Sequence, residues 1–158
     1  MSECNTIVQT VPEDNNFDGP VTAEAFYMSS GGDLSAITRN LTLQNPARRE
    51  VITFFSAEAN FRVTRMRAIL RADDNYFYPG IDFSLRFNQN FPSMGSGTEL
   101  TSGGFSIDFY PNEASLDVST FTNSIIPKNS WVTLETLALG EGEGVERELA
   151  VSLFLERS

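Results

Sequence analysis

The chain has 158 residues but no histidine and only one cysteine. Without histidine, Ser-His-Asp and Cys-His nucleophile sets are excluded, and so are the usual zinc, copper and non-haem iron sites. Cys4 has no second cysteine with which to form an intrachain disulfide, so the fold must be stable without one. These absences predict a protein that is not an enzyme and has no cofactor.

The lack of histidine does not exclude catalysis by carboxylates alone, because a glycosidase needs only two acids on opposite sides of the bond that it cleaves. A hydrolase is therefore kept as a third class of function, although no spacing singles out a pair. The aspartates that could serve it are Asp73, Asp74, Asp82, Asp108 and Asp117. The acidic run GEGEG at residues 140–144 would repel phosphate and is typical of a hairpin loop.

Long apolar runs are also missing. No stretch approaches the roughly 18 to 20 apolar residues that span a bilayer, and MSECNTIVQTVPEDNN lacks the basic and apolar regions of a secretory signal. The formal net charge of −10 repels nucleic-acid phosphates and anionic lipids. We expect a protein made in a cytoplasm, with neither nucleic acid nor a membrane as its partner.

What the chain does contain is strand pattern. It has 13 phenylalanines, and Ile81, Phe83, Leu85 and Phe87 alternate with polar residues. Successive side chains of a strand point to opposite faces, so this alternation predicts a strand with one buried face. The same period recurs in residues 61–72, 105–110 and 149–156. The predicted core is Phe83, Leu85, Phe87, Ile107, Phe109, Val132 or Trp131, Leu134, Leu149, Val151 and Leu153.

Weaker strands are predicted at residues 5–11, 21–28, 36–43 and 50–57, with turn residues between them. MRAILRA could form a helical turn, but its length and its β-branched neighbours favour a strand. No linker, repeat or low-complexity tract divides the chain. The sequence therefore predicts one all-β domain over residues 1–158, an antiparallel, jelly-roll-like β-sandwich.

Four arginines fall in one predicted strand: Arg62, Arg65, Arg67 and Arg71. They could form a solvated face that pairs with acidic residues across the sheet. Arg65 and Arg67 could instead contact an acidic partner, because arginine is favoured at interfaces. Both interpretations stay open at this point.

The run DNNFDG matches the first half of a calcium-binding loop, with Asp14, Asn16 and Asp18 as ligands. The pattern then requires a glutamate at its twelfth position, where this chain has Ala25. Oxygen-rich turns are common without metal. Calcium is therefore only an alternative to a protein without cofactor.

Three adjacent aromatics, Tyr76, Phe77 and Tyr78, lie between two predicted strands. They cannot all face one core, so at least one ring should be exposed. The rings could fold over the open end of the sandwich, anchor a protein interface, or stack against a sugar.

The second half of the chain resembles a β-sandwich module of structural proteins in tailed phages. The resemblance covers residues 61–158, through FRVTRMRAILRADD, IDFSLRFNQN, SGTEL and TFTNSIIPKNSWVTLETLALGEGEGVERELAVSLFLE. Its most specific part is the stretch Trp131–Glu135. Thr133 stands where that module has a second tryptophan, and Ala150 where it often has histidine. Residues 1–60 have no counterpart in the module.

The resemblance implies a non-enzymatic virion component made in the host cytoplasm, with other virion proteins as partners. Only about 60 residues precede the module, and they lack the repeats of a fibre stalk, which favours a protein that decorates the surface of the head. A homo-oligomer, most simply a trimer, is expected. The alternatives are a protein associated with the tail or fibre, and a free carbohydrate-binding module.

Overall fold

The computed structural model describes residues 36–72, 80–108, 113–140 and 146–158, and these form ten strands and no helix. The strands predicted at residues 5–11 and 21–28 lie outside this part of the chain. The described strands are β1 (Ala36–Gln44), β2 (Val51–Ser56), β3 (Phe61–Ala72), β4 (Ile81–Asn88), β5 (Thr98–Glu99), β6 (Phe105–Ile107), β7 (Glu113–Val118), β8 (Ile125–Ile126), β9 (Trp131–Leu139) and β10 (Arg147–Arg157).

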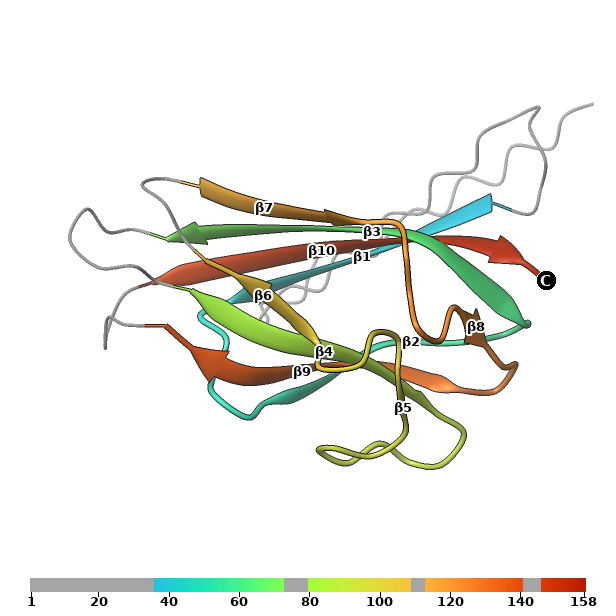
Figure 1. Cartoon of the computed structure of the whole chain (residues 1–158). Coiled ribbons are helices and arrows are strands. Elements are labelled where there is room, and N and C mark those ends of the chain that lie inside the picture. The colour runs from blue at the N-terminus through green and yellow to red at the C-terminus, as the bar shows by residue number, and fades with distance from the viewer. Residues whose placement is uncertain (1–35, 73–79, 109–112, 141–145) are drawn as a thin grey trace, which may run out of the picture.

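The strands form two antiparallel sheets that pack face to face (Figure 1). The first sheet has the order β1-β10-β3-β7, and β8 also pairs with β3. The second sheet has the order β2-β9-β4-β5, and β6 also pairs with β4. If β5 with β6, and β7 with β8, each count as one interrupted edge strand, the orders are 1-8-3-6 and 2-7-4-5. This is the arrangement of an eight-stranded jelly roll, so the predicted fold class is confirmed.

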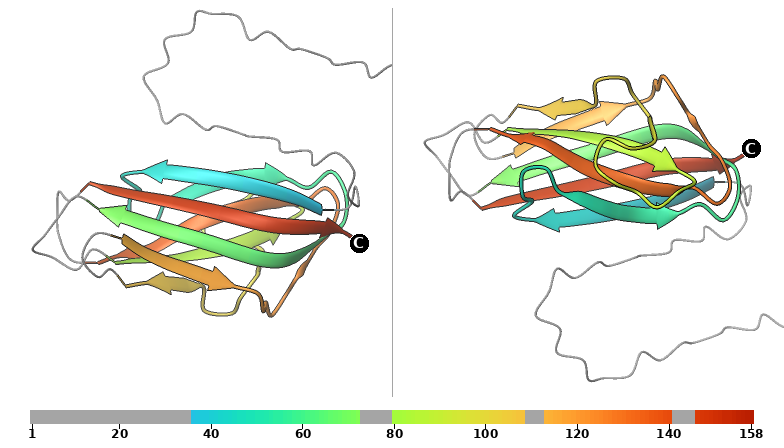
Figure 2. Two further views of the ribbon diagram at one scale, coloured as in Figure 1. Left: turned by 90° about the horizontal axis from the view of Figure 1, so that it is seen from above. Right: turned by 90° about the horizontal axis from the view of Figure 1, so that it is seen from below.

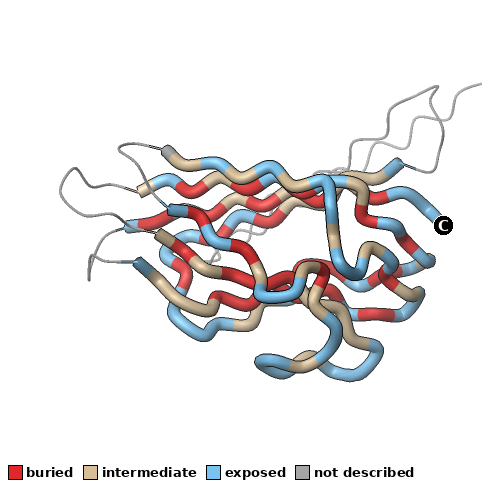
Figure 3. The backbone as a smooth tube through the Cα atoms, viewed as in Figure 1, coloured by how far each residue is buried: buried red, intermediate tan, exposed pale blue. Residues whose placement is uncertain are grey.

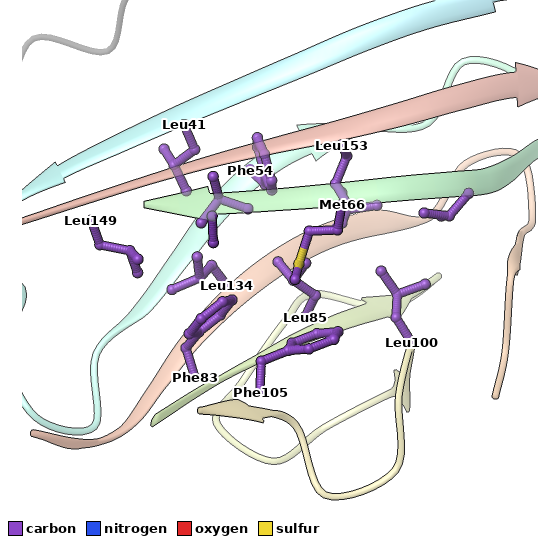
Figure 4. Close-up of a cluster of buried hydrophobic side chains, with 14 of the residues drawn as sticks. Leu41, Phe54, Met66, Phe83, Leu85, Leu100, Phe105, Leu134, Leu149 and Leu153 are labelled. Carbon is purple, nitrogen blue, oxygen red and sulfur yellow. The ribbon is translucent and has the colours of Figure 1, made fainter. Parts of the chain in front are cut away.

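The hydrophobic core fills the space between the sheets. Along β10 buried residues alternate with half-buried ones, as the period of two requires. Figure 3 shows this alternation along β10 and its neighbour β3 in the first sheet. Side chains from both sheets meet in the middle, among them Met66, Phe83 and Leu153 (Figure 4). The buried members of the predicted core are Phe83, Leu85, Ile107, Val132, Leu134, Leu149, Val151 and Leu153.

The remaining positions of the predicted core have different outcomes. Of the two alternatives offered, Val132 faces the core, whereas Trp131 is 38% exposed. Phe87 is only half-buried and packs against the edge of the core. Phe109 lies outside the described residues.

A β-bulge changes the alternation within β3. Phe154 of β10 lies opposite Arg65 and the next residue, Leu155, lies opposite Val63, so Thr64 is an extra residue in β3. The hydroxyl of Thr64 donates a hydrogen bond of 3.2 Å to the carbonyl oxygen of Phe154. Because of the extra residue, Val63 and Met66 both face the core although they are three positions apart. The strand predicted for MRAILRA is confirmed.

A charged side chain points inward from the edge strand β1. Arg39 lies opposite the core residue Leu153, and its guanidinium carbon lies 5.6 Å from the centre of the Phe55 ring. Its Nη2 forms an ion pair of 3.3 Å with Glu58. Inward-pointing charges on edge strands disfavour pairing with the edge of another sheet. The period of two places Arg39 on the same face of β1 as Leu41 and Leu43, and the structure turns that face toward the core.

The loop between β4 and β5 turns at two glycines in the left-handed region, Gly95 (φ 71°) and Gly97 (φ 85°). A Cβ atom at Gly97 would lie 2.5 Å from the carbonyl oxygen of Phe87, whereas at Gly95 it would meet nothing within 4 Å. We expect Gly95→Ala to lower the free energy of unfolding by about 1–2 kcal/mol from backbone strain alone. Gly97→Ala should lower it further, because the backbone must also move. Urea denaturation measures both, and equal losses would contradict the close approach at Gly97.

Candidate interaction surface

The described residues define two ends of the sandwich, between which the strands run lengthwise (Figure 2). At one, the loop end, the amide of Gly140 donates a hydrogen bond of 2.8 Å to the carbonyl of Gly80, and Arg147 pairs with Ala72. At the other, the C-terminal end, Asn60 accepts hydrogen bonds from the amides of Lys128 and Ser158. Surfaces on the outer faces and at these two ends are the candidates for function.

Several predicted site residues cannot be placed on these surfaces. Tyr76, Phe77 and Tyr78 lie outside the described residues, and so do the calcium-ligand candidates Asp14, Asn16 and Asp18. An exposed aromatic ring and a calcium ion therefore stay predictions.

The two predicted interface arginines lie on the outer face of the first sheet. Arg65 Nε donates a hydrogen bond of 2.8 Å to Asp117 Oδ1, and Arg67 Nε donates one of 3.0 Å to Asp117 Oδ2. Asp117 belongs to the neighbouring strand β7, where its register partner is Arg67. The structure thus gives both arginines an acidic partner across the sheet. Their use in an interface stays a prediction.

The hydrogen bond from Arg65, followed by that from Arg67, holds the pKa of Asp117 well below its usual range. A carboxyl whose pKa is lower in the folded than in the unfolded chain stabilises the fold above the unfolded pKa, which is about 3.9. This stabilisation disappears as the pH falls toward the folded pKa.

We expect Asp117→Asn to be less stable than the wild type by a constant amount from neutral pH down to about pH 5. Below about pH 4 the difference should shrink, because the unfolded wild-type chain then takes up a proton at this carboxyl, which the folded chain binds only at lower pH. Urea midpoints across this pH range test it. Since the pair is exposed, added salt should also reduce the difference. If the stability difference between the wild type and Asp117→Asn grew as the pH fell, the two arginines would not be stabilising the ionised form of Asp117.

A shallow pocket of about 300 Å³ lies at the loop end, lined by Gln44, Arg71, Ala72, Glu146, Arg147 and Glu148. Arg71 Nη1 donates a hydrogen bond of 2.8 Å to Glu148 Oε1, and Gln44 Nε2 donates one to the other oxygen of that carboxylate. Arg147 is 7% exposed, its Nη2 donates to the carbonyl of Gly140, and burial lowers the pKa of its guanidinium. The polar side chains of the pocket are thus held in place by hydrogen bonds, either to one another or to the backbone.

A partly buried ion-pair network, in which Glu135 is the most buried member, lies on the outer face of the second sheet. Arg86 Nε of β4 lies 3.0 Å from Glu135 Oε2 of β9, and Arg86 Nη2 pairs with Glu99 of β5. The loop of residues 89–97 lies over this network: Arg86 donates to the carbonyls of Gly95 and Gly97, and Glu135 accepts a 2.9 Å hydrogen bond from the amide of Gly95. The network therefore holds the loop against the sheet. In Figure 1 this loop lies below the second sheet.

Sequence reasoning missed this network. The alternation with Val132 and Leu134 does place Glu135 on the outer face, where a solvated carboxylate would be expected. The loop of residues 89–97 instead leaves Glu135 only 1% exposed.

Large apolar side chains are exposed around this loop and the C-terminal end. Phe91 of the loop is 86% exposed, and Met94, Ile125 and Trp131 are each about two-fifths exposed. Trp131 lies opposite Asn88, which directly precedes the loop. Exposed aromatic and methionine side chains are typical of protein interfaces when they gather in one region.

The described residues hold no group of three or more Cys, Asp or Glu side chains that could bind a metal ion, and none of their elements is a helix long and apolar enough to cross a membrane. The carboxylates named for a hydrolase are only partly placed, since Asp73 and Asp74 lie outside the described residues. Asp82 and Asp117 lie on different sheets, and each bonds a neighbour: Asp82 accepts a hydrogen bond from Ser106.

No known protein family and no curated protein matches the sequence. Among solved structures, a chain of the cyanophage Pam1 capsid asymmetric unit is similar at 10% sequence identity, with a TM-score of 0.47. The alignment covers 90% of this chain and 100% of that one.

Proposed function

We propose that the chain is a non-enzymatic structural protein of a tailed-phage virion and that it docks on the outside of the head as a decoration protein. Residues 61–158 resemble a module of such proteins, and their most specific stretch, Trp131–Glu135, begins β9 and supplies Glu135 to the buried network. The jelly roll is a fold used by capsid and lectin domains, which supports the proposal by analogy alone.

The observation that carries the proposal is Phe91. Its ring is 86% exposed, yet it sits on a loop that Arg86 and Glu135 fasten to the second sheet. An apolar side chain held in water by a fixed loop loses little conformational entropy when a partner covers it. Aromatic side chains of this kind act as anchors in interfaces.

The test is to examine the parent particle by mass spectrometry and cryo-electron microscopy. Density for this chain on the outer surface of the head supports the proposal. Density only at the tail would favour the tail-associated alternative, and absence from the particle would overturn both. With isolated heads, Phe91→Ala should weaken binding by about tenfold or more, the loss expected of an interface anchor.

We further propose that the protein acts as a homo-oligomer, with a trimer the simplest form. Two features support contacts between copies: the exposed apolar side chains, and the arginines of β3, which are Arg62, Arg65, Arg67 and Arg71. Light scattering of the purified full chain measures the mass directly. A monomer at micromolar concentration would contradict self-assembly while leaving docking on the head intact.

A second candidate is recognition of a glycan at the loop end. The polar pocket formed by Gln44, Arg71 and Glu148 favours it, since arginine, glutamate and glutamine side chains can hydrogen-bond sugar hydroxyls. Ala72 lines the same pocket, and the aromatic run Tyr76–Tyr78 follows it in sequence. A glycan array with the full chain tests this. Glycan binding by the wild type that is lost both in Gln44→Ala and in the variant with alanine at Tyr76, Phe77 and Tyr78 would support this candidate function. If the wild type bound no glycan, the candidate would be wrong.

A further inference from the structure

The charge of the protein is divided unequally along the chain. All 11 lysine and arginine residues lie in the described sandwich, together with 11 of the 21 aspartates and glutamates. The formal charge of the described residues is therefore zero. Of the ten remaining carboxylates, six lie in residues 1–35, which contain no lysine or arginine. The whole net charge of −10 thus comes from residues outside the described ranges.

Three exposed cations lie together at the C-terminal end of the sandwich. Arg62 is the second residue of β3, and Arg157 pairs with its first residue, Phe61. The amide of Lys128 donates a hydrogen bond to Asn60, which directly precedes Phe61. None of the three forms an ion pair with another residue of the described ranges. This distinguishes them from Arg65, Arg67 and Arg71, each of which forms an ion pair across the sheet.

Two of the exposed apolar side chains lie at the same end of the sandwich. Ile125 is 45% exposed and pairs with Arg62, and Trp131 is 38% exposed and begins β9, three residues after Lys128. The C-terminal end therefore combines unpaired positive charge with uncovered apolar surface. Such a surface is complementary to a segment that carries both carboxylates and apolar side chains.

The chain itself contains such a segment. Residues 13–28 hold four carboxylates, Glu13, Asp14, Asp18 and Glu24, and they end in the apolar run Phe26-Tyr27-Met28. Only seven residues separate this run from Ala36, and Ala36 pairs with Glu156 at the C-terminal end. Seven residues span at most about 25 Å, so the segment is tethered close to the surface it would cover. A short tether of this kind gives an effective concentration of about the millimolar range.

We propose that residues 13–28 bind the C-terminal end of their own sandwich, with their carboxylates on Arg62, Lys128 and Arg157 and their aromatic run against Ile125 and Trp131. The contact would cover the apolar surface at this end with a segment of the same molecule. It would also leave the loop end of the sandwich open. The inference does not depend on a role in a virion.

Trp131 is the only tryptophan of the chain, so its fluorescence in the full-length protein reports directly on this surface. In the wild type we expect acrylamide to quench Trp131 poorly. Phe26→Ser combined with Tyr27→Ser should make quenching several-fold more efficient and shift the emission to the red. This variant changes no residue of the described sandwich, so it tests docking without threatening the fold.

Charge reversal tests the ionic part. Lys128→Glu should weaken docking by about fivefold, and adding Glu24→Lys should restore part of it. Arg48→Glu is the matched control, since it makes the same charge change at an exposed residue of the turn between β1 and β2, at the other end of the sandwich. It should leave quenching unchanged.

Two outcomes would overturn the proposal. One is wild-type quenching equal to that of the Phe26→Ser, Tyr27→Ser variant, which would mean that the segment does not cover Trp131. The other is protection of Trp131 that disappears on dilution, which would assign the covering segment to a second copy of the chain.

Discussion

Phe83→Ala is expected to lower the free energy of unfolding by about 3–5 kcal/mol, as truncation of a fully buried aromatic ring does. Phe83 has no exposed surface, and its ring centre lies 5.4 Å from that of Phe105. It stands in the middle of the core between the two sheets (Figure 4), where neighbours held by their strands cannot collapse into the space. Urea denaturation of the full chain measures the loss.

Phe91→Ala is the matched control, because the same atoms are removed from a ring that is 86% exposed. We expect a change within about 0.5 kcal/mol. Similar losses for the two variants would mean that Phe91 is packed against the protein and cannot serve as a docking anchor. The variant used to test docking on the phage head is therefore also the stability control.

Arg86→Met is expected to cost about 3–5 kcal/mol, because it leaves a carboxylate buried without its cation. Glu135 is only 1% exposed, and its Oε2 atom lies 3.0 Å from Arg86 Nε. The variant should also release the loop of residues 89–97, which Arg86 holds through the carbonyls of Gly95 and Gly97. Urea denaturation measures the stability, and the rate of proteolytic cleavage in the loop measures its release.

Arg71→Met makes the same chemical change in an exposed ion pair, since Arg71 is 56% and its partner Glu148 is 29% exposed. There we expect a loss of at most about 1 kcal/mol. Replacing both partners of the buried pair, by Arg86→Met with Glu135→Leu, should recover part of the stability lost in the single variant. If Arg86→Met cost no more than Arg71→Met, the network would not be acting as a buried ion pair.

Much of the fold could be predicted because most strands bury one face. Leu149, Val151 and Leu153 repeat at a period of two, and the structure buries all three. The alternation does not show where an extra residue enters a strand, and so it did not predict the bulge at Thr64. It also did not predict that Phe54 and Phe55 are both buried where β2 shifts its register against β9.

The candidate surface was predicted less well than the fold. The paired arginines of β3 were anticipated as one alternative, because acidic residues of neighbouring strands are their natural partners. The inward position of Arg39 and the burial of Glu135 were not anticipated. The ion-pair partner of Arg39 and the loop that covers Glu135 come from segments distant in sequence. Glu58 reaches Arg39 from the turn between β2 and β3, and the loop of residues 89–97 covers Glu135.

Period-two hydrophobicity and the absence of histidine by themselves determined that this is an all-β sandwich without histidine chemistry. These properties are local, because burial of one strand face and the kinds of side chain present do not depend on which strands are neighbours. Tertiary structure decided which charges lie in pairs and which apolar side chains stay in water. Arg65 meets Asp117 across a sheet, whereas the described sandwich itself does not cover Arg62 and Trp131 at its C-terminal end. Contacts of this kind join residues far apart in the chain, so only the order and register of the strands can specify them.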